Sequence, residues 1–196
     1  MLIDYIKKYN EKNLKDFINE KNEKGITALH YASYKGNYSI IKLLINLGAD
    51  EFSLSNMQLN VFHFCAQGKK PNSLMYFYLT YKHHRDMEKR NLINLIKDVD
   101  KGGSTPLHWA AYSDAEEVLL YILNLDIFQN EREKQEFIDK GDNKGKTAYI
   151  LVLRVNQLEL FQNYYKMVQL LTSRIIQAKL LINWPLRRNK IKSHKY

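Results

Sequence analysis

A short motif recurs along the chain and constrains its fold more than any other feature of the sequence. The clearest copy is Gly-Ser-Thr-Pro-Leu-His-Trp-Ala-Ala, at residues 103–111. Its Thr-Pro pair predicts the start of a helix, because a proline at the first helical position gives up an amide hydrogen that had no partner, and the threonine hydroxyl can cap the helix. Leu107, Ala110 and Ala111 then fall on one helical face, where two small residues let a second helix approach. That second helix is predicted over residues 117–123.

Three further copies of the motif reveal a repeat. They are Gly-Ile-Thr-Ala-Leu-His-Tyr-Ala-Ser at 25–33, Asn-Val-Phe-His-Phe-Cys-Ala at 60–66 and Gly-Lys-Thr-Ala-Tyr-Ile-Leu-Val-Leu at 145–153. Counted from the threonine, or from Asn60 in the second copy, the intervals are 33, 45 and 42 residues. A period of 33 residues with two helices per unit resembles the ankyrin repeat, as does the Gly48-Ala49-Asp50 ending of the first unit. The two longer intervals predict insertions.

The resemblance implies an all-α fold, an ankyrin-repeat solenoid of about four repeats with hairpin loops along one edge. Residues 1–21 are expected to form two N-terminal capping helices, because an end unit must cover a face that interior units bury. The repeat domain is predicted over 22–184, with units near 22–54, 55–97, 100–140 and 142–184, and residues 185–196 form a basic tail.

Insertions are expected in three places. The one near 82–97 contains a predicted helix at 91–96, the one near 129–135 is charged and is predicted to be a solvated loop, and the third lies near 156–163. In the last unit, residues 158–161 and 167–171 compete for the second helix. The later register is favoured because Val-x-Leu-Leu matches Ile41-x-Leu43-Leu44 in the first unit.

Charge and composition narrow the possible functions. The net charge is +9, but five positive residues lie in the last twelve positions, which contain no acid. A basic tail is therefore a stronger signal than a general basic bias. The single cysteine, Cys65, agrees with a reducing compartment. Without a signal-peptide core or an apolar run near the roughly 18 residues of a membrane span, we expect a cytoplasmic protein, or one at the cytosolic face of a membrane.

No pattern in the sequence indicates an enzyme or a cofactor site. There is no glycine-rich phosphate loop, no nucleophile with a placed base and no pair of carboxylates on one predicted face. Histidines spaced one per repeat cannot converge on one metal ion. We interpret the motif residues as structural, with the threonine capping its helix and the histidine bridging backbone or threonine groups between repeats: Thr27, His30, His63, Thr105, His108 and Thr147.

A candidate partner-binding surface follows from the same register. The residue after each motif histidine is Tyr31, Phe64, Trp109 or Leu151, and this column either packs between repeats or floors a groove on the concave side. An aromatic surface rimmed by lysine and arginine suits an extended peptide with apolar anchors or some acidic character. The residues predicted to face a partner are Lys24, Tyr31, Tyr34, Lys35, Phe64, Gln67, Trp109, Tyr112, Ser113 and Arg154, with Met57, Lys101 and Lys144 at the other hairpin tips.

A narrower resemblance is carried by three stretches, residues 60–77, 103–113 and 184–188. They are similar to the cytosolic ankyrin domains of protist DHHC-type protein S-acyltransferases, or palmitoyltransferases. The resemblance implies a domain that recruits protein substrates, with Trp109 matching a tryptophan that helps line the peptide groove in animal relatives. A second groove residue of those relatives, an asparagine, is replaced here by Gly68. The Asp-His-His-Cys motif and its zinc ligands are absent from this chain.

We therefore expect a non-catalytic, monomeric protein-interaction domain, recruiting substrates for a palmitoyltransferase whose membrane part is not in this chain. One alternative is a stand-alone ankyrin scaffold or adaptor unrelated to acyl transfer. A second alternative is electrostatic binding of nucleic acid or an anionic membrane through residues 185–196.

Overall fold

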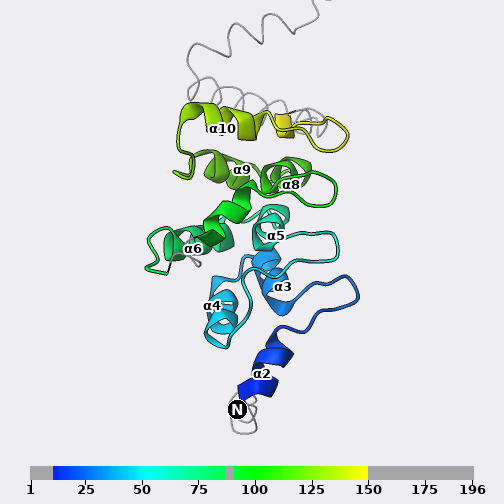
Figure 1. The fold of residues 1–196 in the computed structure, drawn as a ribbon, viewed down its shortest axis with the longest axis vertical. Coiled ribbons are helices and arrows are strands. Elements are labelled where there is room, and N and C mark those ends of the chain that lie inside the picture. The colour runs from blue at the N-terminus through cyan, green and yellow to red at the C-terminus, as the bar shows by residue number, and fades with distance from the viewer. Residues whose placement is uncertain (1–10, 87–90, 150–196) are drawn as a thin grey trace, which may run out of the picture.

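The computed structural model describes residues 11–86 and 91–149, and this part of the chain is helical (Figure 1). Its helices are α2 (Glu11–Ile18), α3 (Ala28–Lys35), α4 (Tyr38–Asn46), α5 (Val61–Gln67), α6 (Asn72–Tyr81), the 3-10 helix η1 (Leu92–Lys97), α8 (Pro106–Tyr112), α9 (Glu116–Leu123) and α10 (Glu131–Ile138). Within these two ranges the only extended pairing is an isolated antiparallel bridge between Gly141 and Thr147. No helix among the described residues is long and apolar enough to cross a membrane.

The helices form antiparallel pairs that stack along one axis. Each motif copy supplies the first helix of a pair, so α3 precedes α4, α5 precedes α6 and α8 precedes α9. The first helices pack on one another in the order α3, α5, α8. Loops project from one side of this row, and α4 and α6 lie on the other side (Figure 1). The stack confirms the expected all-α solenoid with its loops along one edge.

A continuous apolar core runs through the stack. The largest fully buried side chains alternate between first and second helices: Leu29, Ile41, Phe62, Phe77, Leu107 and Ile122 are among them. Phe62 of α5 meets Phe77 of α6 edge to face, with ring centroids 5.6 Å apart. Because each pair buries only part of its apolar surface alone, neighbouring pairs must stack to complete the core.

Helix α2, in the predicted N-terminal cap, is joined to the first repeat by burial and by hydrogen bonds. Leu14 and Ile18 of α2 are buried. Asn19, just after the helix, donates from Nδ2 to the carbonyl of Gly48 (2.9 Å) and accepts from the amide of Asp50 (2.7 Å). These bonds attach the cap to the Gly-Ala-Asp ending of the first unit. The first predicted capping helix lies outside the described residues.

Both insertions that the structure describes contain a helix. The helix expected at 91–96 is present as η1, with Leu92, Ile93 and Ile96 buried. The solvated loop expected at 129–135 is wrong, because α10 begins at Glu131 and buries Phe137 and Ile138. The Asn130 side chain caps this helix by accepting the amide of Glu133, at 2.9 Å. In the sequence, the two apolar residues that this helix buries follow six polar residues, and the segment therefore reads as a solvated loop.

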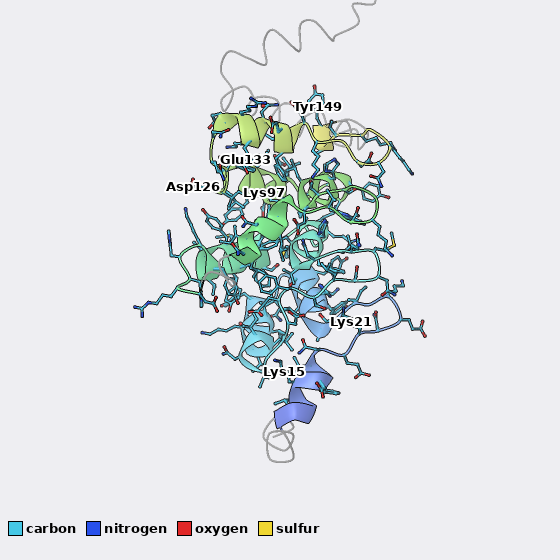
Figure 2. The ribbon with its side chains drawn as sticks, viewed as in Figure 1. Lys15, Lys21, Lys97, Asp126, Glu133 and Tyr149 are labelled. Carbon is cyan, nitrogen blue, oxygen red and sulfur yellow. The ribbon has the colours of Figure 1, made fainter. Side chains whose placement is uncertain are left out.

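The two insertions also contact each other. Lys97, at the end of η1, forms a 2.7 Å ion pair with Glu133 of α10 (Figure 2). The same ammonium lies 5.3 Å from the ring centroid of Phe128. Lys82, in the first insertion, forms a second pair with Asp126, which lies just before the second insertion, at 3.1 Å. The insertions therefore link the second repeat to the third without interrupting the row of first helices.

Several predictions fall outside the described residues. They are the insertion near 156–163, the choice between the two registers of the last second helix and the basic tail at 185–196. Of the last unit, the structure describes the hairpin and the residues up to Tyr149.

Candidate protein-binding surface

The motif histidines form hydrogen bonds with main-chain carbonyls of the loops between helix pairs. His30 Nε2 lies 2.9 Å from the carbonyl of Ser53, His63 Nε2 lies 3.0 Å from that of Ser104, and His108 Nε2 lies 3.1 Å from that of Lys146. A carbonyl only accepts hydrogen bonds, so each Nε2 carries the proton. His63 and His108 thus donate to the unit that follows in the chain, whereas His30 donates to Ser53, near the end of its own unit.

The other nitrogen of each ring secures the start of its own helix. Nδ1 accepts the backbone amide of Thr27 (3.1 Å), Asn60 (3.2 Å) or Thr105 (3.2 Å). Asn60 replaces threonine in the second repeat and caps α5 by accepting the amides of Phe62 and His63. Thr27, Asn60 and Thr105 thus stand at the N-caps of α3, α5 and α8, each paired with the histidine of its motif. Thr147 pairs with Gly141 in the bridge that closes the fourth hairpin.

Burial keeps these imidazoles neutral. It lowers the pKa of His30 and of His63 to about 4, and it also lowers the pKa of His108. The carbonyl that each Nε2–H contacts opposes this effect but does not overcome it. Within the described residues no group of three or more His, Cys, Asp and Glu side chains could hold a metal ion.

Each hairpin is organised by a polar residue five positions before the motif threonine. Asn22, Asp100 and Asp142 accept two hairpin amides each through one side-chain oxygen, and Ser55 accepts the amide of Leu59. Sequence reasoning missed this position. The signal was present, because Asn, Ser and Asp recur there in register and these residues favour such turns.

Main-chain bonds join each hairpin tip to the next. The amide of Asn56 donates to the carbonyl of Lys24 (3.0 Å), that of Lys101 to Met57 (3.0 Å) and that of Asn143 to Gly102 (2.9 Å). Asn56 and Asn143 add side-chain bonds to the carbonyls of Glu23 and Lys101. The tips therefore form one ordered edge. The exposed side chains of the predicted tips Lys24, Met57, Lys101 and Lys144 do not take part in these bonds.

Trp109 is fixed against the base of its own hairpin. Its indole Nε1 donates to the buried carboxylate of Asp100, at 2.9 Å. The ring is half-buried and meets Tyr112 edge to face, with centroids 6.2 Å apart. Tyr112 is 69% exposed, while the following residue, Ser113, is partly exposed. This cluster presents a fixed tryptophan beside an open tyrosine, on the side of α8 that faces the hairpin.

A second cluster occupies the corresponding positions of α3. Tyr31 and Tyr34 lie with ring centroids 6.3 Å apart, and Tyr31 is 59% exposed. The ammonium of Lys35 lies 5.3 Å from the centroid of each ring. Tyr31, Tyr34 and Lys35 therefore form one cationic aromatic surface, which we call the α3 cluster. Trp109, Tyr112 and Ser113 form the α8 cluster.

Between the clusters, α5 departs from the sequence prediction. Phe64 was expected to face a partner, but it is 6% exposed and packs on the ring of His30, with centroids 4.7 Å apart. It belongs to the packing between repeats. Gln67 is partly exposed, as expected. Gly68 lies against the carbonyl of Tyr34, so closely that a Cβ atom would collide with that oxygen.

Of the predicted surface residues on these helices, Tyr31, Lys35 and Tyr112 are exposed, and Tyr34, Gln67, Trp109 and Ser113 are partly exposed. We call the first helices α3, α5 and α8, together with the loops that project beside them, the hairpin face (Figure 1). Its residues include the α3 cluster, Gln67, the α8 cluster and the hairpin tips. Phe64 is buried and does not contribute to this face, and Arg154 lies outside the described residues.

Comparison with known families agrees with this architecture. Residues 2–45 match a family model described as ankyrin repeats in many copies, and residues 102–129 match one described as an ankyrin repeat. The chain therefore contains ankyrin repeats, and the described helices form an all-α ankyrin solenoid. Ankyrin repeats are in general non-catalytic modules that bind protein partners.

One curated relative is the tyrosine-protein kinase HTK16 of Hydra vulgaris. The two chains are 25% identical over 151 residues, which cover 77% of this chain and 18% of the kinase. The chain thus spans less than a fifth of the length of this relative. Neither the family matches nor this relative links the chain to the DHHC-type S-acyltransferases.

Proposed function

We propose that the hairpin face binds a protein partner and that this binding is the function of the domain. The observation that carries the proposal is the pair of aromatic clusters on α3 and α8, two first helices of one row with α5 packed between them. Tyr31 and Tyr112 expose more than half of their surfaces although the core beside them is closed. Tyrosine and tryptophan dominate the binding energy of protein interfaces, because they bury a large area at a small entropic cost.

The way Trp109 is held also supports the proposal. Because Asp100 fixes the indole, a partner would not have to order that side chain, and ordering a free side chain costs about 0.5–1.5 kcal/mol on binding. The α3 cluster is similarly constrained by the contact of Lys35 with both tyrosine rings. Prepared aromatic surfaces of this kind favour recognition over catalysis.

The test is a quantitative pull-down from the native host with wild type, Tyr112→Ala, Tyr31→Ala and Tyr38→Ala. Tyr38 is the matched control, because it is 57% exposed but lies on α4, away from the hairpin face. We expect a set of partners that both hairpin-face variants lose and the control retains. Equal recovery by all four proteins would contradict the proposal.

We also propose a more specific role, substrate recruitment for a DHHC-type S-acyltransferase at the cytosolic face of a membrane. It is supported by the similarity of residues 60–77, 103–113 and 184–188 to such domains. The test is to sequence the messenger RNA beyond Tyr196. An open reading frame encoding hydrophobic spans and an Asp-His-His-Cys motif is expected, and a stop codon directly after Tyr196 would remove this role while leaving the general one.

A further inference from the structure

The two aromatic clusters are separated by a low stretch of the hairpin face. Phe64 of α5 stands at the position of Tyr31 and Trp109 but is buried. Gly68 stands at the position of Lys35 and Ser113 and has no side chain. Gln67, at the position of Tyr34 and Tyr112, is partly buried. A ligand lying along the stack can therefore contact both clusters without meeting a barrier at α5.

The spacing of the clusters sets a length for such a ligand. They lie on α3 and α8, which are separated by α5 in the row of first helices. Packed helices are about 8–10 Å apart, so two steps along the row amount to roughly 16–20 Å. An extended chain rises about 3.3 Å per residue, so two of its side chains would span the clusters when they are about five or six residues apart.

The exposed lysines of the hairpin face favour a ligand that carries negative charge. Lys24, Lys35 and Lys101 are exposed, and none forms an ion pair within the described ranges. Among the acids nearby, Asp100 holds the indole and two hairpin amides, Asp114 lies 3.9 Å from Lys69, and Glu23 is exposed beside Lys24. Lys35 in particular offers its ammonium beside two apolar rings.

We infer that the partner is an extended acidic segment carrying two apolar anchor residues five or six positions apart. One anchor lies on the α3 cluster, with a carboxylate next to it that pairs with Lys35. The other anchor lies against Trp109 and Tyr112. This inference rests on the proposed function, since it specifies what the hairpin face binds.

The experiment is selection from a phage library of random 16-residue peptides on the full chain. The same selection is performed in parallel on Tyr31→Ser/Tyr112→Ser and on the control Tyr38→Ser. Peptides enriched on wild type are then synthesised, and their Kd values are measured by fluorescence anisotropy against wild type, Lys35→Glu and each single tyrosine variant.

We expect enriched peptides to share two apolar residues at a separation of five or six, with aspartate or glutamate beside one of them. Shortening the separation by three residues should weaken binding about tenfold, because one anchor then leaves its cluster. Lys35→Glu should weaken binding by a similar factor, and Tyr38→Ser should leave it unchanged.

The outcomes separate this inference from the proposed function. Peptides that depend on Tyr31 or Tyr112 but show one anchor, another spacing or a basic character would overturn the inference and leave the binding face intact. Enrichment that is the same on wild type and on the double variant would overturn both.

Discussion

Gln58 adopts a backbone conformation that the other three hairpins assign to glycine. Its φ is 61°, against 73°, 77° and 69° at Gly25, Gly103 and Gly145, which stand two positions before the motif threonine as Gln58 does before Asn60. A residue with a Cβ atom pays about 1–2 kcal/mol in this left-handed region.

Replacing Gln58 by glycine should therefore stabilise the protein. The gain should be about 0.5–1 kcal/mol, since relief of the left-handed conformation is partly offset by the greater entropy of glycine in the unfolded chain. The measurement is the free energy of unfolding in urea. Gln58→Ala is the control, because alanine keeps the Cβ atom, and an equal gain in that variant would contradict the explanation.

The buried histidines predict a dependence of stability on pH. Unfolded histidine binds a proton below about pH 6.5, whereas burial holds the pKa of His30 and His63 at about 4. Stability is therefore complete above pH 6.5 and falls as the pH decreases towards 4, by up to about 1.4 kcal/mol per pH unit for each of these histidines.

Urea unfolding between about pH 7 and pH 5 measures this loss, in a range where most carboxylates remain ionised. His63→Gln should flatten the slope, since glutamine does not titrate. If the free energy of unfolding of this variant changes with pH as steeply as that of the wild type, His63 does not contribute to the pH dependence of stability.

The role of a single residue could be predicted from the sequence where the repeat motif alone determined what surrounds its side chain. The roles of His30 and His108 follow from the motif, since the residues they bond are part of the repeat itself. Phe64 was mistaken because its register matches that of Tyr31 and Trp109. Its burial depends on how α5 lies between its neighbours, and a register of positions within one repeat does not contain that information.

Among the elements, α10 was mistaken because its sequence, Glu-Arg-Glu-Lys-Gln-Glu-Phe-Ile, contains six polar residues before two apolar ones. Charge suggested a loop. The helix forms because Asn130 caps its start and Phe137 and Ile138 bury at its end. The 91–96 helix was predictable, since apolar residues recur through it at helical spacing.

Phe137→Ala tests whether α10 is part of the core. Phe137 is buried and packs on Phe128, with ring centroids 5.3 Å apart. The substitution should cost about 3–4 kcal/mol of the free energy of unfolding, as expected for truncation of a buried phenylalanine. Thermal or urea unfolding measures the effect. Arg132→Ala, on the exposed side of the same helix, should change it by less than about 0.5 kcal/mol. If Phe137→Ala left the free energy of unfolding unchanged, the interpretation of this segment as a solvated loop would be correct after all.

For the whole molecule, the order of the stack was predictable because all copies of the motif share one register. Each repeat contacts mainly its neighbours, so stability is transmitted from one repeat to the next through their interfaces. The partnership of the two insertions was not predictable. Lys97 and Glu133 are 36 residues apart, and nothing local in either segment indicates their contact.

This architecture predicts that a substitution which weakens the repeat of α5 and α6 lets the repeats on either side of it unfold independently. His63→Ala removes the bond to Ser104 and leaves the amide of Asn60 without its acceptor. Hydrogen exchange followed by mass spectrometry should show α3 and α8 losing protection together in the wild type and separately in the variant. Ser113→Ala, a substitution at a partly exposed position, should preserve the joint loss. Joint loss in both proteins would show that the interface does not depend on this histidine.

The edge formed by the hairpin tips has a consequence for how such a domain can diverge. Its continuity depends on main-chain amides and carbonyls at positions such as Lys24, Met57 and Lys101, so the identity of the side chain there is free. Gene copies of this domain can exchange one amino acid at a time at the tips and acquire a new ligand preference, while every intermediate sequence still folds. The common ancestry of such copies would then remain detectable from their buried motif residues after their ligands had become different.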